Sequence, residues 1–179
     1  MILDIARLML FPALLAFAAS SDLFTMKISN RISLALIAGF VVLALFGGMG
    51  LHDFLMHLAA GAIVLVVAFT CYAIGQVGGG DAKIAACVAL WFGFGHLMEF
   101  LLFASLFGGA LTLALLQFRQ WPLPRLLNGQ DWLLRLHDKH SRVPYGLALA
   151  FGALVVYPET EWIKAIDVTH IAMLRASQG

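Results

Sequence analysis

This sequence has unusually few charged residues. Of its 179 residues, only 12% are charged and 62% are hydrophobic, and the mean hydropathy is +0.94. Soluble domains carry about 25% charged residues, so this composition excludes an ordinary soluble domain and indicates an integral membrane protein. The formal net charge of +1 gives no electrostatic basis for nucleic-acid binding, and we predict no nucleic-acid partner.

Cysteine is scarcer still. The two cysteines, Cys71 and Cys87, each lie inside an apolar run and have no partner at metal-ligand spacing, which argues against a disulfide framework or a zinc site. His52, Asp53 and His57 have a spacing that a metal could use, but they fall on the side of the membrane opposite the acids discussed below. We therefore predict no metal and no organic cofactor.

Long polar segments are nearly absent. A membrane helix needs roughly 20 apolar residues, so the chain has room for about six spans and none for a sizeable soluble domain. The apolar runs lie at about 5–21, 32–50, 54–76, 82–95, 97–118 and 143–158. We predict an all-α, polytopic membrane protein of about six transmembrane helices, with residues 1–179 forming a single membrane-embedded domain.

The one long polar segment is 119–142, which lies within this domain. It holds five basic residues, with Trp121 and Trp132 suited to a membrane interface, and its two Leu-Leu pairs (Leu126-Leu127 and Leu133-Leu134) predict a helix on the membrane surface. The basic residues are Arg119, Arg125, Arg135, Lys139 and Arg142. We expect this segment to face the cytoplasm and to contact anionic lipid headgroups or an acidic partner.

The placement of lysine and arginine predicts the orientation. Eight of the eleven basic residues lie in the connections 21–31, 76–83 and 119–142. The opposite connections, 47–53 and 94–98, hold none. Basic loops stay in the cytoplasm, so both termini are expected outside. Asp22 ends the first run and Asp81 follows the third, which places both acids on the cytoplasmic side.

A signal peptide is an alternative for the first run, because Ala-Phe-Ala-Ala-Ser at 16–20 could serve as a cleavage site. The preceding region has a single basic residue, Arg7, offset by Asp4, whereas secretory signals begin with net positive charge. Cleavage there would make Asp22 the mature N-terminus. We therefore favour a retained first span.

The stretch from Gly78 to Lys83 contains a candidate catalytic residue, Asp81. An ionisable residue at the edge of a hydrophobic span is costly and is read as functional by default, and three glycines before Asp81 would let another chain come close. Two aspartates at a partly desolvated site share a proton, as in aspartic proteases. We predict that Asp22 and Asp81 activate water, although either acid could instead cap or end a helix.

Three motifs resemble those of the type IV prepilin peptidases, which are membrane aspartic proteases. Residues 78–83 look like the Gly-x-Gly-Asp-x-Lys motif, residues 22–30 are similar to a signature with an Asp, a basic residue and Ile-Pro-Asn, and residues 143–148 resemble the Pro-Tyr-Gly entry to the last span. The resemblance covers nearly the whole chain. It implies a bacterial inner-membrane, multi-pass peptidase domain that uses Asp22 and Asp81 to cleave short basic leaders of prepilin-like proteins at the cytoplasmic face.

The resemblance also implies supporting residues around the two acids. These are Gly78, Gly79, Gly80, Lys83, Lys27, Asn30, Pro144 and Tyr145. Lysines near a membrane boundary also snorkel or act as orientation anchors, and Asn30 could cap the second span. Ser29 stands where the family usually has proline.

No Cys-x-x-Cys motif is present and 21 residues precede Asp22, so the chain resembles the short, peptidase-only members that serve Flp-type tight-adherence pili. We expect no N-methyltransferase activity. The expected partners are a prepilin-like, membrane-anchored substrate, membrane lipid, and components of a pilus or secretion assembly.

Other functions stay open at this point. A related peptidase could act on a pseudopilin or an archaeal preflagellin, the same acids could serve a small proton- or cation-coupled transporter, or the chain could be a structural subunit of a secretion assembly. Transporters often show a repeated half and acids near the bilayer midplane. This sequence has neither feature.

Overall fold

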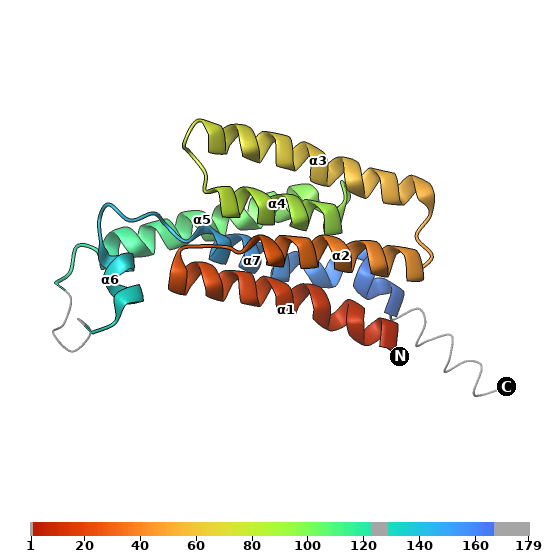
Figure 1. The fold of residues 1–179 in the computed structure, drawn as a ribbon, viewed down its shortest axis with the longest axis horizontal. Coiled ribbons are helices and arrows are strands. Elements are labelled where there is room, and N and C mark those ends of the chain that lie inside the picture. The colour runs from red at the N-terminus through yellow and green to blue at the C-terminus, as the bar shows by residue number, and fades with distance from the viewer. Residues whose placement is uncertain (1, 123–128, 167–179) are drawn as a thin grey trace.

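A computed structural model describes residues 2–122 and 129–166, and these residues form helices and connections without a strand. The helices are α1 (Ile2–Thr25), α2 (Asn30–Phe46), α3 (Leu51–Ala73), α4 (Gly79–Phe92), α5 (Leu97–Phe118), α6 (Asp131–His137) and α7 (Tyr145–Val156), followed by the short 3-10 helix η2 (Tyr157–Glu159) (Figure 1). The predicted all-α class is confirmed, and a helix forms in each of the six apolar runs.

The helices differ in length. Three of them, α1, α3 and α5, are long and apolar enough to cross a membrane. In contrast, α4 has 14 residues, and at 1.5 Å per residue it spans about 21 Å, less than the roughly 30 Å of a bilayer core. The structure thus shows a helical protein with three helices that are long and apolar enough to cross a membrane, while the count of six spans stays a prediction.

Helix α4 lies at the centre of the bundle. It packs against α2, α3 and α7, and its side chains from Ile84 to Phe92 are almost all buried. Its outer end is held by Trp91, whose indole N–H donates to the carbonyl oxygen of Leu36 at 2.9 Å, and by Trp162, whose indole N–H donates to the Trp91 carbonyl at 2.6 Å. Because α4 is fixed on several sides, its first turn, which carries Asp81, has a defined position.

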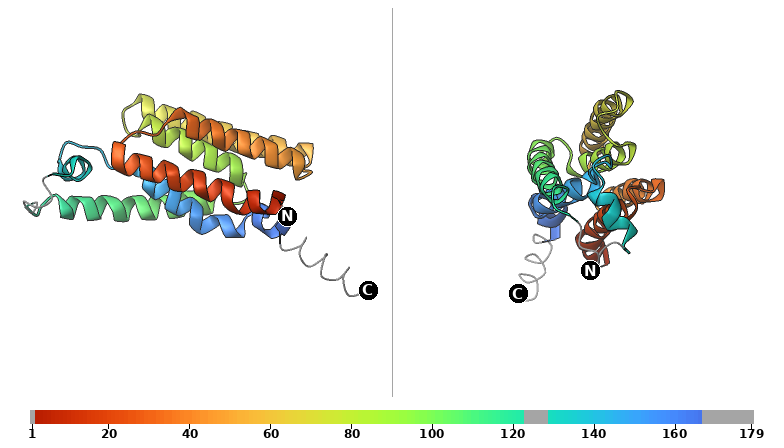
Figure 2. Two further views of the ribbon diagram at one scale, coloured as in Figure 1. Left: turned by 60° about the horizontal axis from the view of Figure 1, so that its bottom comes forward. Right: turned by 90° about the vertical axis from the view of Figure 1, so that its left-hand side faces the viewer.

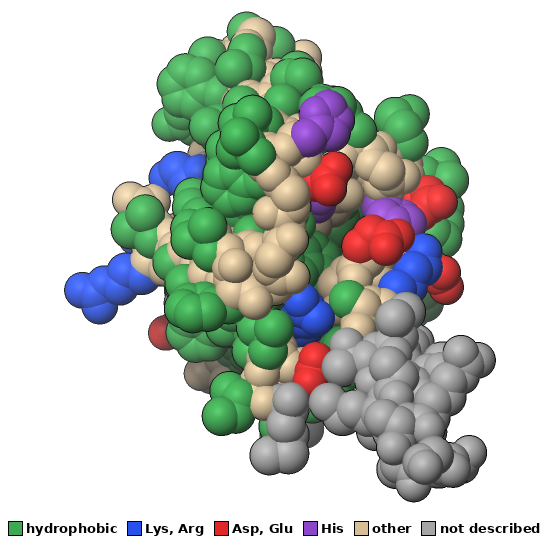
Figure 3. Space-filling model, turned by 90° about the vertical axis from the view of Figure 1, so that its right-hand side faces the viewer, with side chains coloured by type: hydrophobic (Ala, Val, Ile, Leu, Met, Phe, Trp, Pro, Cys, Tyr) green, Lys and Arg blue, Asp and Glu red, His purple; other side chains and the backbone are tan. Residues whose placement is uncertain are grey.

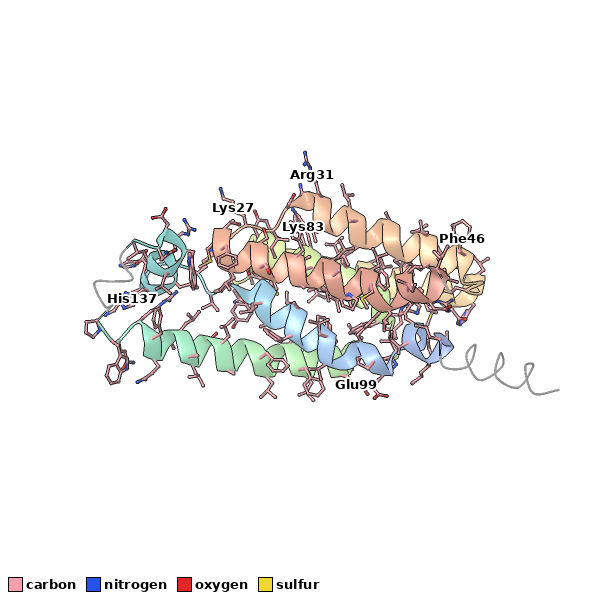
Figure 4. All side chains as sticks on the ribbon, turned by 90° about the horizontal axis from the view of Figure 1, so that it is seen from below. Lys27, Arg31, Phe46, Lys83, Glu99 and His137 are labelled. Atoms are coloured by element: carbon pink, nitrogen blue, oxygen red, sulfur yellow. The ribbon has the colours of Figure 1, made fainter. Side chains whose placement is uncertain are left out.

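The connections divide between the two ends of the bundle. The α1–α2 and α3–α4 connections and α6 lie at one end, whereas the N-terminus and the α2–α3 and α4–α5 connections lie at the other (Figures 1 and 2). Lys27 and His137 lie toward the first end, and Phe46 and Glu99 toward the second (Figure 4). Asp22 and Asp81 therefore lie at the same end, as the charge pattern predicted.

The second end is also polar at its surface. Histidine, acidic and basic side chains gather there among apolar ones (Figure 3), and a cavity of about 640 Å³ at this end is lined by His52, Asp53, His57 and His96, among others. Across the described ranges, 2–122 and 129–166, no group of three or more His, Cys, Asp or Glu side chains could hold a metal ion.

The polar segment 119–142 folds back onto the bundle. Arg119 is only 8% exposed, and its guanidinium donates to the carbonyl oxygens of Leu136 at 2.8 Å and Ser141 at 3.1 Å. Within this segment α6 has seven residues, and the pair Leu126-Leu127 falls outside the described residues. Arg119 therefore holds the segment together from inside, which its place in a basic stretch did not predict.

The start of α2 corrects one expectation. Ser29, and not Asn30, is the N-cap residue: it has an extended backbone, and its hydroxyl accepts a hydrogen bond from the N–H of Arg31 at 3.3 Å. Asn30 is the first helical residue, and its side-chain oxygen accepts instead from the Lys83 ammonium at 2.7 Å. The serine that departs from the family pattern thus takes the capping role.

Candidate active site

Asp22 lies in the last turn of α1 and is 7% exposed. One of its carboxylate oxygens, Oδ2, accepts a hydrogen bond from the backbone N–H of Gly146 at 2.8 Å. Gly146 is in the first turn of α7, where unpaired N–H groups and the helix dipole favour a negative charge. A β-carbon at Gly146 would lie 2.8 Å from Asp22 Oδ2 and 2.9 Å from Ile28 Cδ1, so only glycine permits this approach.

The chain reverses directly after Asp22. Met26 has a positive φ of 54°, which is uncommon for a residue with a side chain, and its N–H donates to the Asp22 carbonyl at 2.8 Å. The Ser21 hydroxyl donates to the carbonyl of Lys27 at 2.8 Å. This turn brings Lys27 and Ile28 back over the end of α1, beside Asp22.

Asp81 lies in the first turn of α4, and Gly78 is the N-cap residue of that helix. The Asp81 carboxylate turns back toward Gly78, where a β-carbon would lie 2.5 Å from Asp81 Oδ2. The backbone N–H groups of Gly78 and Gly146 both favour the ionised form of Asp81. From the sequence, Asp81 could have been the N-cap residue of this helix. In the structure Asp81 is instead the third helical residue, and its carboxylate faces the site.

The glycine triplet makes room for the protein's own atoms. A β-carbon at Gly79 would lie 3.2 Å from the Tyr72 ring, and one at Gly80 would lie 3.1 Å from Ile28 Cβ. We expected the glycines to admit an extended substrate. In the structure they admit the Asp81 carboxylate, the α3 tyrosine and the turn after α1, which together fix the position of Asp81.

Asp22 and Asp81 line one cavity of about 560 Å³ at the end of the bundle. The pKa of Asp81, which lies outside the long apolar spans, is raised to about 7, first by burial and second by the negative charge of Asp22. Two carboxyl groups that repel each other in this way share one proton near neutral pH. Such sharing gives one ionised and one protonated carboxyl group, the pair of states that aspartic proteases use to activate water.

Three cations line the same cavity: Lys27, Arg135 and Arg142. Arg142 favours the ionised form of Asp81, and Arg135 donates to the carbonyl oxygen of Phe24 at 2.6 Å, which ties α6 to the end of α1. Gly146, Arg142, Arg135 and Met26 were not singled out from the sequence. The Pro-Tyr-Gly motif contained Gly146, but nothing in the pattern said that its N–H would reach Asp22.

The predicted supporting residues divide into three groups. The glycine triplet and Lys27 line the cavity with the two acids. Lys83 and Asn30 bond to each other and line a different groove, between α2, α3 and α4. Pro144 is the buried residue preceding α7, and Tyr145 lines a further groove that Asp81 also lines, with its hydroxyl 3.3 Å from that of Thr112.

A helical membrane protein whose two aspartates, from different helices, face one cavity has the arrangement that indicates the class of membrane aspartic peptidases. Comparison with protein families agrees: the model of the type IV leader peptidase family matches residues 9–113. This match covers more than half of the chain and includes both aspartates, so the chain belongs to the type IV leader peptidase family and is a peptidase. Searches of curated proteins and of solved structures gave no match.

Proposed function

We propose that this protein is an aspartic endopeptidase that cleaves the short basic leader of prepilin-like proteins, specifically Flp-type pilins, with Asp22, Asp81 and one water molecule. The observation that carries the proposal is that both carboxyl groups line one cavity at the loop end of the bundle, although they are far apart in the chain. No metal, organic cofactor or methyltransferase activity is part of the proposal.

The chemistry follows from the shared proton. Asp22 accepts the Gly146 N–H at a helix N-terminus and acts as the base, while Asp81, with its pKa raised to about 7, carries the proton. Asp22 takes a proton from water as the water oxygen attacks the scissile carbonyl carbon, and Asp81 gives its proton to the carbonyl oxygen. Collapse of the resulting diol breaks the C–N bond: one diol hydroxyl returns its proton to Asp81 as the new carbonyl forms, and the leaving amine takes the proton held by Asp22.

The proposed location is the bacterial inner membrane, with the cavity facing the cytoplasm. Support comes from the basic residues: Lys27, Arg135 and Arg142 line the cavity itself. Loops rich in lysine and arginine stay in the cytoplasm. A membrane-anchored precursor would present its leader on that side, and lipid and pilus-assembly components are the other proposed partners.

The test replaces each acid separately. Asp22→Asn and Asp81→Asn keep the size of the side chain, and processing of a co-expressed Flp-type pilin precursor is followed by its change in mass. We expect either substitution to abolish processing, whereas Asp53→Asn, an exposed acid at the opposite end of the bundle, leaves it unchanged. Normal processing by Asp22→Asn or Asp81→Asn at equal protein abundance would refute the proposal.

A further inference from the structure

Asp81 is shared by two cavities of different character. Besides the polar cavity with Asp22, it lines a groove of about 740 Å³ whose other walls are mostly apolar. Gly78, Arg142 and Val143 also line both. The groove therefore meets the candidate active site at Asp81. Among the described residues that line the groove, Arg142 is the one charged side chain besides Asp81.

Helix α3 forms one long wall of this groove. It packs mainly on α4 and stands at the edge of the bundle (Figures 1 and 2), with only Ala60 and Gly61 buried. Val64, Val67, Ala68 and Cys71 line the groove at a spacing that puts them on one face of the helix. From Ile63 to Cys71 the α3 wall extends over about 12 Å, at 1.5 Å per residue.

The remaining walls come from α4, α5 and α7. The lining side chains are Ala82 and Ala85 on α4, Leu97 and Leu101 on α5, and Tyr145 and Leu149 on α7. Small residues at a helix surface allow another helix to approach closely, which is the main source of helix association in lipid. Ala68, Ala82 and Ala85 give the groove such a surface close to Asp81.

A second groove on the other flank of α3 provides a comparison. It has a volume of about 530 Å³ and is lined by Leu58, Ala62 and Leu65 of α3, with residues of α2 and α4. It is also apolar, but neither Asp22 nor Asp81 lines it. Of these two grooves beside α3, only the first leads to an acid.

We infer that the groove between α3, α4, α5 and α7 holds the apolar, membrane-anchored helix of the substrate, in the position that brings the adjoining scissile bond to Asp81. This inference rests on the proposed function and adds to it the surface that binds the substrate. The α2–α3–α4 groove does not take part in binding. Continuity with Asp81 decides between the two grooves, because a helix in the other groove would not lead the chain to the acids.

The first experiment narrows each groove by the same change on the same helix. Ala68→Phe fills the groove that reaches Asp81, and Ala62→Phe fills the other groove. Processing of the full-length precursor is measured in proteoliposomes. We expect Ala68→Phe to slow processing about tenfold, equivalent to about 1.4 kcal/mol, and Ala62→Phe to process at the wild-type rate.

The outcomes separate this inference from the proposed function. A wild-type enzyme that does not process the precursor would refute the proposed function. If the wild type processes the precursor and Ala68→Phe processes it at the same rate, only the groove assignment is refuted. A larger loss of rate with Ala62→Phe than with Ala68→Phe would also refute that assignment.

A second experiment does not depend on the folding of a phenylalanine variant. Cys71 is a partly exposed residue of the groove wall, whereas Cys87 is buried. The uncleaving variant Asp22→Asn is reconstituted with precursors that carry one cysteine in the apolar segment, and the sample is oxidised. We expect a disulfide between Cys71 and the precursor that is lost in Cys71→Ser. No such link at any position along the apolar segment, or a Cys71 link between two copies of the enzyme instead, would overturn the inference.

Discussion

Gly146→Ala tests the contact on which the site geometry depends. The added β-carbon would lie 2.8 Å from Asp22 Oδ2, 2.9 Å from Ile28 Cδ1 and 3.1 Å from Asp22 Cβ, whereas ordinary contacts of this kind are about 3.5–4.0 Å. Asp22 or the start of α7 must therefore move by roughly half an ångström or more. That movement lengthens the 2.8 Å hydrogen bond from the Gly146 N–H to Asp22.

The expected loss of processing rate in Gly146→Ala follows from these contacts. Overpacking costs about 1–3 kcal/mol, and a weakened hydrogen bond to a charged group costs about 1.5–3 kcal/mol at most. Because a misplacement of about 1 Å can cost about 100-fold in rate, we expect precursor processing to fall by about that factor while the protein still folds. The assay is the initial rate of precursor processing in detergent, with thermal unfolding measured on the same sample.

Gly152→Ala is the matched control for overpacking. Gly152 is on the same helix, and its β-carbon would lie 2.7 Å from the backbone nitrogen of Ala104, away from both acids. We expect Gly152→Ala to lower the unfolding temperature at least as much as Gly146→Ala, with a far smaller loss of rate per folded molecule. The reasoning is refuted if Gly146→Ala keeps the wild-type rate, or if both variants lose the same rate per folded molecule.

Three further predictions concern charge. Arg142→Gln removes a positive charge that lowers the pKa of Asp81, so the alkaline limb of the pH–rate profile should move to higher pH; a shift to lower pH contradicts the assignment of Asp81 as the acid. Because the folded-state pKa of Asp81 is raised from 3.8 to about 7, its contribution to stability is lost as pH rises between these values. Asp81→Asn should therefore unfold at a higher temperature than the wild type at about pH 8, and should lose that advantage at about pH 4. Lys83→Met should process precursor within about twofold of the wild type, because Lys83 bonds to Asn30 and lies outside the cavity of the two acids; a large loss would show that Lys83 acts on the substrate.

The positions of the helices, and the end of the bundle shared by the acids, could be predicted from the sequence. Apolar runs of sufficient length become helices, and the number of crossings between Asp22 and Asp81 puts both acids at one end. The glycine triplet drew attention to its stretch because three consecutive glycines are expensive to order. The groups that fill the space at Gly78, Gly79 and Gly80 could not be predicted, however, and are Asp81, Tyr72 and Ile28.

Contacts between distant parts of the chain could not be predicted. The Gly146 N–H reaches Asp22 across 124 residues, and no periodicity or composition encodes such a pairing. Arg119 belongs to a basic stretch that reads as a solvated surface, yet its guanidinium is buried among carbonyl oxygens. The cap of α2 shifted by one residue because Asn30 has a competing partner in Lys83, which lies on another helix.

The short length of α4 has a consequence for the opposite end of the bundle. Helix α4 spans about 21 Å, whereas α1, with 24 residues, spans about 36 Å. Asp22 in the last turn of α1 and Asp81 in the first turn of α4 line one cavity, so the shortfall lies beyond the last turn of α4. Trp91 and Phe92 of that turn line the cavity of about 640 Å³, which is therefore the space that the short central helix leaves open and that a longer α4 would fill.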